Sequence, residues 1–236
     1  MLLCDFHVHT AYSDGSLALH RVVDLFGRSG HDVIAITDHI VNRDNPLGKI
    51  AHAAGRSLNQ ESWKRYRDEI EREAERAWRT WRMVVIPGAE LTRNTLHRDT
   101  SVHVLALGLD EYLPADGDPI SMLREIRERG AISVACHPHE TSEFFANTWY
   151  LWNRRPVLGD LVDLWEVANR WELFPVVSRE VLPHVAGSDF HRPEHLYAWK
   201  TLIKAERNRA DVLRALRRGT GIGVLRLTPK AAAVSA

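Results

Sequence analysis

The fold is decided near the N-terminus by the stretch LLCDFHVHT, residues 2–10. Its apolar beginning predicts a buried strand, and His7 and His9 follow at alternate positions. Successive side chains of a strand point to opposite faces, so both imidazole rings project to the same side. One strand end therefore offers two nitrogen ligands to one metal ion, although a single H-x-H pair is more often part of a hydrogen-bonded core.

The same arrangement recurs along the chain, because imidazoles and carboxylates stand at or beside the ends of further short apolar runs. In a βα barrel the strand ends gather the chemistry at one face. Independent core histidines do not explain such recurrence. We therefore predict one metal site made by His7, His9, Asp14, His39, Glu90, His103, His137, Asp189 and His191.

Composition indicates a single domain over residues 1–236, because no linker-like segment divides the chain and the candidate ligands run from residue 7 to residue 191. Lys plus Arg and Asp plus Glu both number 31, so no global field attracts nucleic acid. Cys4 and Cys136 provide no disulfide framework, which fits a reducing compartment. Without a leader or a membrane-spanning stretch, we expect a cytoplasmic protein with no membrane partner.

Helix and strand signals alternate, as an α/β barrel requires. Apolar spacing and capping residues predict helices over 19–30, 118–129 and 208–218. The longest predicted helix, 60–82, carries an apolar stripe on one side. Residues 41–59 are polar and contain Pro and Gly, so we expect a long loop beside the site.

With these motifs the chain resembles the PHP (polymerase and histidinol phosphatase) superfamily. The matching motifs, in family order, are DFHVHTAYSDG (5–15), ITDH (36–39), GAE (88–90), HVLALG (103–108), HP (137–138) and GSDFH (187–191). The resemblance implies a distorted seven-stranded (β/α)7 barrel similar to a TIM barrel. It also implies two or three divalent metal ions and the hydrolysis of a phosphate ester by water activated at the metals.

The resemblance also divides the ligands among three metals, with Glu90 as the bridge between the first two. A carboxylate has two oxygens and can bridge two cations, whereas a neutral imidazole offers one lone pair. Ligation without thiolate suits Mn, Zn or Fe, and Mg is also compatible. The implied sets are His7, His9, Glu90 and Asp189 for the first metal, Glu90, His103 and His137 for the second, and Asp14, His39 and His191 for the third.

Two positions depart from the common family pattern. Asp14 stands where many members have histidine, and this variant resembles the branch that acts on nucleotide or oligonucleotide phosphates. The expected partner is a small phosphorylated substrate: a nucleotide, a short oligonucleotide or another phosphomonoester. His139 stands where that branch tends to have glycine, and it could be a ligand, a leaving-group acid, a phosphate donor or a surface histidine.

A phosphate group needs cationic partners besides the metals, and arginine matches its oxygens best. Arg192 directly follows a ligand and has the strongest claim, with Arg43 and Arg93 as alternatives. The residues expected to take part in catalysis are Asp14, Glu90, His191 and Arg192.

Two further segments are candidates for supporting roles. Glu166 and Asn169 follow the apolar run 161–165 and could hold the ligands from behind, or simply hydrogen-bond a loop. The aromatic residues between His137 and Glu166 either pack the barrel rim or form a wall of the substrate pocket; they are Phe144, Phe145, Trp149, Tyr150 and Trp152.

Three alternatives remain open: a monoesterase similar to histidinol phosphatase, a metal hydrolase of the amidohydrolase type, and a non-catalytic domain stabilised by metals. Binuclear amidohydrolases also begin with H-x-H but commonly use a carboxylated lysine as the bridge. No lysine here ends a mid-chain strand, and Glu90 fills that role. Every ligand position of the PHP pattern is filled, which argues against a non-catalytic domain.

Overall fold

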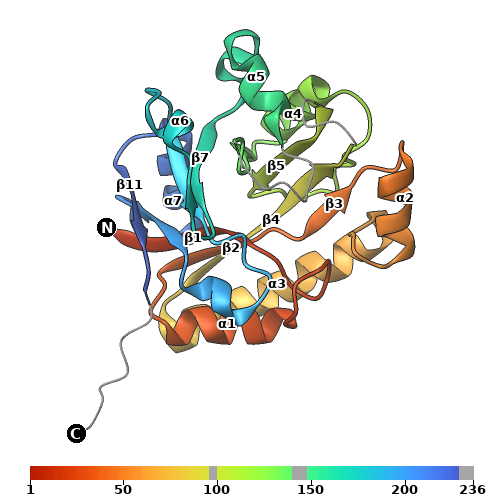
Figure 1. Ribbon diagram of the computed structural model, residues 1–236. Helices are drawn as coiled ribbons and strands as arrows, with labels where there is room; N and C mark the ends of the chain where they lie inside the picture. Colours follow the sequence, from red (N-terminus) through yellow and green to blue (C-terminus); the bar gives the residue numbers. More distant parts are fainter. Residues whose placement is uncertain (96–99, 140–147, 229–236) are drawn as a thin grey trace, which may run out of the picture.

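The computed structural model describes residues 1–95, 100–139 and 148–228. Its centre is a curled mixed sheet with helices packed around the outside (Figure 1). The sheet runs in the order β11 (Ile222–Arg226), β10 (Trp199–Ile203), β1 (Leu2–Val8), β2 (Val33–Ile36), β4 (Val84–Arg93), β5 (Val102–Leu107), β6 (Ile132–Ala135), β7 (Leu164–Asn169) and β8 (Glu172–Leu173). Two more strands pair beside this path, β3 (His39–Val41) with β4 and β9 (His184–Gly187) with β7.

The curl brings the end of β9 against the end of β1. Phe190 forms an isolated parallel bridge with Val8. The backbone N–H of His9 donates to the Phe190 carbonyl at 2.8 Å, and the Phe190 N–H donates to the His7 carbonyl at 3.0 Å. The residues after both strands are therefore held side by side, although they lie at opposite ends of the sequence.

The mixed α/β architecture agrees with the prediction, but the distorted seven-stranded (β/α)7 barrel is not confirmed. The sheet has 11 strands of mixed direction. Strand β5 runs antiparallel to both β4 and β6, which interrupts the parallel order. This reversal places the beginning of β5, with His103, at the edge where β4 and β6 end.

The predicted helices are confirmed with small changes at their ends. Helices α1 (Leu19–Arg28) and α3 (Gln60–Trp81) lie along one side of the sheet, while α4 (Pro119–Glu128) and α5 (Trp149–Leu158) lie on another side (Figure 1). Helices α6 (Pro175–Ser178) and α7 (Arg209–Arg218) follow later in the chain. Side-chain caps explain several starts, since Asn59, Asp118 and Asn208 each accept a hydrogen bond from the first turn of a helix.

The prediction of a long loop over residues 41–59 is wrong. Residues within it form α2 (Pro46–Ala53). The Asn45 side chain accepts from the Gly48 N–H, and Pro46 occupies the first turn, so the start signal is present in the sequence. Within this helix only Gly48 is buried, so the helix lacks an apolar stripe. The spacing of its apolar residues therefore does not predict a helix.

Helix α7 closes the end of the curl that lies away from His103. It contacts β4, β6 and β10, which are not neighbours in the sheet. Its buried Val212 and Leu216 belong to the same core cluster as Cys4 and Cys136, both of which are free buried thiols. The cysteines therefore pack as small apolar residues, as expected.

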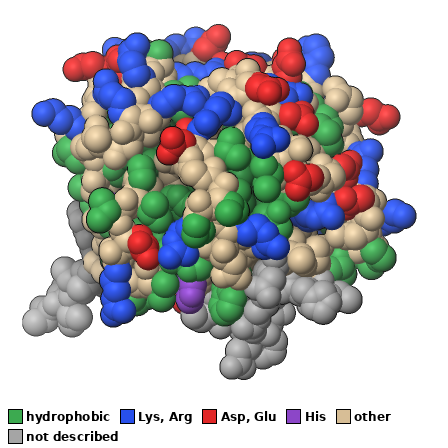
Figure 2. Space-filling model, turned by 90° about the horizontal axis from the view of Figure 1, so that it is seen from above, with side chains coloured by type: hydrophobic (Ala, Val, Ile, Leu, Met, Phe, Trp, Pro, Cys, Tyr) green, Lys and Arg blue, Asp and Glu red, His purple; other side chains and the backbone are tan. Residues whose placement is uncertain are grey.

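The outer surface mixes charges of both signs. Figure 2 shows one face, on which Lys and Arg side chains alternate with Asp and Glu among apolar groups. Within the described residues, no helix is both long and apolar enough to cross a membrane.

Candidate metal centre

Glu90, which is 1 % exposed, lies at the centre of the histidine cluster. It comes from β4, and its register partner Leu105 on β5 places His103 nearby. Its two oxygens face different histidines. Oε2 lies 3.2 Å from His7 Nε2, His9 Nε2 and His39 Nδ1, whereas Oε1 lies 2.6 Å from His103 Nδ1 and 3.9 Å from His137 Nε2.

Asp189 joins the cluster from the segment after β9. Its Oδ1 lies 3.5 Å from His7 Nε2, 3.4 Å from His9 Nε2 and 3.3 Å from His191 Nδ1. Asp189 has a φ of 46°, and His137 has a φ of 28°. Such left-handed conformations are costly for residues other than glycine, and they concentrate at functional sites where the surroundings enforce them.

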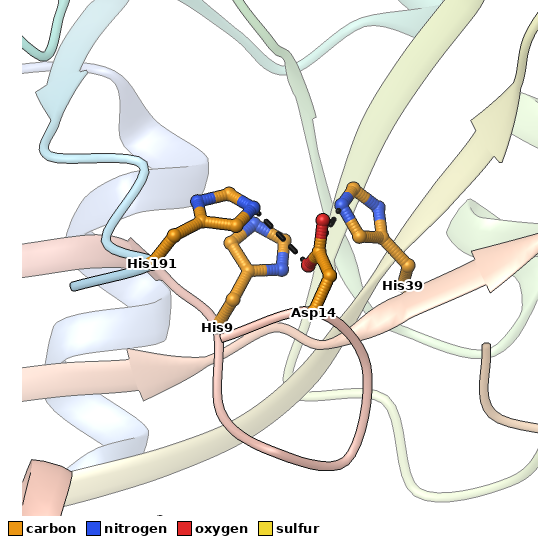
Figure 3. Close-up of side chains that lie close together, drawn as sticks. All are labelled: His9, Asp14, His39 and His191. Carbon is orange, nitrogen blue, oxygen red and sulfur yellow. Dashed lines mark ion pairs between the residues drawn. The ribbon is translucent and has the colours of Figure 1, made fainter. Parts of the chain in front are cut away.

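Asp14 forms a second carboxylate centre at the more open side of the cluster. Its Oδ1 lies 3.1 Å from His191 Nε2 and 3.5 Å from His39 Nε2. Figure 3 shows the carboxylate between these two rings, with His9 beside them. The His9 ring stacks on both, with centroids 4.4 Å from His39 and 4.3 Å from His191.

The loop that carries Asp14 is fixed from below by buried Asp38. This carboxylate accepts hydrogen bonds from the Thr10 N–H at 2.8 Å, the Thr10 hydroxyl at 2.8 Å and the Ser13 hydroxyl at 2.6 Å. A Cβ atom at Gly15 would lie 2.6 Å from the His9 carbonyl oxygen, so only glycine fits this tight turn. The position of Asp14 is therefore determined by its neighbours.

The ligand atoms meet the requirements of a metal cluster. All nine predicted residues converge. Eight of them fall into sets whose ligand atoms lie within 4.8 Å of one another, and Asp189 joins them through its contacts with His7 and His9. His9 Nδ1 is buried without a hydrogen-bond partner among the described residues, and His9 Nε2 lies within 3.4 Å of two carboxylates, an arrangement that suits a bound cation. The sets relevant here are His7, His9 and Glu90; Glu90, His103 and His137; and His9, Asp14, His39 and His191.

These sets place Glu90 in two groups, as the predicted bridge requires. They also place His9 in two groups, whereas the resemblance assigned it to the first metal alone. The His9 ring contacts the rings of both His39 and His191, which explains its proximity to the Asp14 group.

The electrostatics differ from ligand to ligand within the cluster. Burial alone would raise the pKa of Glu90, but the surrounding histidines, His39 first, hold it well below its usual value. Burial lowers the pKa of His39 to about 3 and that of His137 to about 4, so both rings are neutral near pH 7. Burial alone would lower the pKa of His9, but Asp189 and Glu90 raise it to about 9, so this ring carries a proton near pH 7 that a bound cation would displace. The buried carboxylates Glu90 and Asp189 therefore favour a positive charge beside His9.

Glu166 supports two of the histidines from behind, where the sequence suggested a supporting role. Its Oε1 lies 2.9 Å from His7 Nδ1, which leaves His7 Nε2 facing Glu90. Its Oε2 accepts from the His137 backbone N–H at 2.7 Å and from Asn169 Nδ2 at 2.8 Å. Carboxylates that hold the second nitrogen of a ligating histidine fix its tautomer and orientation.

A cavity of about 390 Å³ opens over this cluster. Seven of its lining residues belong to the nine candidate ligands, since His7 and His9 lie deeper. The remaining wall combines two cations, two polar groups and two small apolar groups: Arg56, Arg170, Thr92, Asn94, Val41 and Ala51. Three of these, Val41 of β3, Ala51 of α2 and Arg56 just after α2, lie in the segment 41–59 that the sequence predicts as a loop beside the site.

The candidate phosphate-binding arginines are placed elsewhere. The Arg192 side chain is 62 % exposed, and its Nε donates to His195 Nε2 at 3.2 Å. Arg93 pairs with Asp44 at 2.5 Å. Among the described residues that line the cavity, the arginines are instead Arg56 and Arg170.

The aromatic candidates are described in part. His139 stacks on Trp149 with centroids 5.1 Å apart, and it belongs to none of the ligand sets found among the described residues. Trp152 is buried and packs edge-on against Trp165, as expected of a packed rim. Phe144 and Phe145 lie outside the described residues.

Comparisons with known proteins place the fold. No protein-family model and no curated protein matches the sequence. The structure is similar to a two-domain protein from Bacteroides vulgatus containing a predicted PHP-like metal-dependent phosphoesterase, with a TM-score of 0.66, 23% identity and coverage of 96% of this chain and 65% of that one. The chain therefore spans about two thirds of the length of that protein.

Two further solved structures are similar over most of the chain. One is named as a metal-dependent phosphoesterase from Bifidobacterium adolescentis (TM-score 0.51, 16% identity, 81% of this chain and 88% of that one). The other is an amidohydrolase from Chromobacterium violaceum with bound sulfate and no metal (TM-score 0.53, 15% identity, 96% and 98%). The resemblance to the PHP superfamily is confirmed at the level of the fold.

Proposed function

We propose that the chain is a metal-dependent hydrolase of the PHP type that cleaves phosphate esters of small substrates. The observation that carries this proposal is the convergence of nine oxygen and nitrogen ligands around buried Glu90 beneath an open cavity. A closed structural metal site would prefer thiolates and four protein ligands, whereas a catalytic site keeps positions open toward its substrate.

The residues fit two or three divalent ions, with Mn, Zn, Fe or Mg compatible with the donor set. Ions held there would supply Lewis acidity and a nucleophilic water near neutral pH. Glu90 has one oxygen for each of two neighbouring sites, and Glu166 keeps His7 turned toward it. The side chains of Asp14 and His191 are 31% and 18% exposed. These two ligands therefore lie at the open side of the cluster, where they can contact substrate.

The substrate class follows from the cavity wall. The wall contains both cations and small apolar groups. It is therefore complementary to a substrate in which an anionic group is attached to a compact organic group. The sulfate bound by the similar amidohydrolase is a tetrahedral oxyanion, like phosphate, and supports this choice. Asp14 favours a nucleotide or oligonucleotide end over histidinol phosphate, with another small phosphomonoester as the remaining candidate.

Amide hydrolysis is the second candidate, because one similar structure is named an amidohydrolase. Its common carboxylated lysine has no counterpart among the described residues that line the cavity, since none of them is a lysine. Lys200 is buried, but its Nζ pairs with Asp5 at 3.0 Å. The bridging role of Glu90 therefore favours phosphate esters.

A substrate screen with the Mn-reconstituted protein tests the proposal. The panel contains nucleoside mono- and bisphosphates, sugar phosphates, short RNA and DNA, and simple amides and lactones. We expect metal-dependent phosphate release from at least one phosphate ester, abolished by a chelator and restored by Mn. Turnover of amides or lactones alone would support the amidohydrolase instead, and turnover of none of these compounds would contradict an enzymatic role in this class.

A further inference from the structure

We propose that Arg170 binds the phosphoryl group of the substrate, the role that the sequence suggested for Arg192. This inference rests on the proposed function and adds a substrate-contacting residue to it. Arg170 directly follows β7, and its side chain lines the cavity above the metal ligands.

The backbone of Arg170 is held in a costly conformation by its neighbours. Its φ is 48°, in the left-handed region that disfavours residues other than glycine. Its N–H donates to the Gly187 carbonyl at 3.1 Å, and its carbonyl accepts from the Trp199 N–H at 3.1 Å. Two strands on either side thus fix the point from which the side chain extends.

The side chain of Arg170 reaches the edge of the ligand cluster. Its Nη2 lies 2.9 Å from Asp189 Oδ2 and 3.3 Å from His191 Nδ1, and Nε lies 3.5 Å from the Asp189 carbonyl. A guanidinium has five N–H donors in a fixed plane. Among the described residues, these contacts use Nε and Nη2, which leaves the two hydrogens of Nη1 for a ligand. The side chain is 39% exposed, which gives solvent and substrate access to it.

This placement suits a phosphoryl group better than a neutral carbonyl. Charge spreads over three equatorial oxygens during phosphoryl transfer, and a preorganised cation beside them stabilises it. Arg170 lies next to Asp189 and His191, so an oxyanion bound at these ligands comes within reach of its free edge. Arg192 instead donates to His195, whose Nδ1 lies 3.1 Å from the Asp189 carbonyl, so Arg192 reaches the backbone behind the site only through His195.

A purely structural role makes a different prediction. If Arg170 served only to orient Asp189, its loss would lower metal content and leave the affinity of the metal-loaded protein for phosphate unchanged. Phosphate binding and metal content must therefore be measured on the same samples.

The test is calorimetric titration of inorganic phosphate into Mn-loaded protein. It compares the wild type with Arg170→Ala, Arg170→Lys and Arg192→Ala. Arg207→Ala is the matched control, because the Arg207 side chain is 41% exposed and also pairs with a carboxylate, Asp32 at the start of β2. We expect Arg170→Ala to weaken phosphate binding about ten- to a hundredfold at full metal content. Lysine should restore part of the loss, since it keeps the charge without the planar fork.

The outcomes separate this inference from the proposed function. Unchanged phosphate affinity in metal-loaded Arg170→Ala would overturn the inference and leave the function standing, as would a loss in Arg192→Ala larger than that in Arg170→Ala. A wild-type protein that binds metal but no phosphate would overturn the proposed function and the inference with it. A loss in Arg170→Ala with Arg207→Ala unchanged supports the inference.

Discussion

Glu90 shows at the scale of one residue how burial and charge work together. A carboxylate taken out of water is costly unless hydrogen-bond donors or positive charges surround it, and here five histidine rings lie within 3.9 Å of it. The two oxygens of Glu90 face two different groups of histidine rings. An amide, which has only one oxygen, could not replace this carboxylate.

Glu90→Gln should therefore abolish turnover while the fold stays intact. Glutamine has one acceptor oxygen and no charge, so it cannot compensate two cations. We expect kcat to fall by at least about a hundredfold, in line with the several kcal/mol that metal catalysis supplies. The measurement is kcat at saturating metal, with circular dichroism as the control for folding. Activity within about tenfold of the wild type would remove Glu90 from the bridging role.

The ligands could be predicted from the sequence because each follows a local rule, a polar residue beside the end of an apolar run. Arg170 also stands at a strand end, directly after Asn169. Nothing local distinguishes it from other arginines, since its partners Asp189 and His191 are about 20 residues away and its left-handed backbone depends on two other strands.

At the scale of elements, strand direction and loop support decide which residues meet. A sequence pattern with a period of two has no direction, so the reversal of β5 could not be predicted from it. His103 lies at the beginning of its strand, whereas His7, His9 and His137 lie at or just after the ends of theirs. The antiparallel pairing of β5 explains why His103 reaches the same edge. Helix α2 was missed for a related reason, because it buries too little to show an apolar period.

The loop over residues 10–15 gives an element-scale prediction. Ser13→Ala removes the hydroxyl that donates to buried Asp38 at 2.6 Å. A buried hydrogen bond to a charged group is worth roughly 1.5–3 kcal/mol, and unfolding free energy should fall by about that amount. The loop also carries Asp14, so metal content should fall by up to one equivalent per chain relative to the wild type. Denaturant unfolding and elemental analysis measure both, with Ser178→Ala as an exposed control. Unchanged stability would show that the loop does not depend on Asp38.

At the scale of the whole molecule, the α/β class and the helices could be predicted, but the shape of the sheet could not. Closure near Val8 and Phe190 joins residues about 180 positions apart by backbone hydrogen bonds, which carry no side-chain signature. The strands β10 and β11 likewise extend the sheet without a motif of their own.

Global stability should depend on pH through His31, a buried histidine outside the metal site. Burial lowers its pKa to about 4, against 6.5 in the unfolded chain. Its Nδ1 lies 2.8 Å from the Ser29 hydroxyl, while Nε2 is buried without a hydrogen-bond partner among the described residues. Between pH 6.5 and 4 the unfolded state binds the proton and the folded state does not, so stability falls as pH falls.

The loss should reach roughly 3 kcal/mol by pH 4 and then level off. The measurement is the unfolding free energy of metal-free wild type minus that of His31→Gln, from pH 7 to pH 4. Subtraction removes the contributions of the metal ligands, which both proteins share. A difference that does not change with pH would contradict a neutral, buried His31.

The central claim is that the curled sheet assembles one multinuclear metal centre, and the metal content of the purified protein tests it most directly. The protein is prepared without chelator, reconstituted with Mn, freed of unbound metal and analysed for its elements against protein concentration. The nine converging ligands exceed what one ion can coordinate, so we predict two or three equivalents per chain. At most one equivalent after reconstitution would contradict the multinuclear centre.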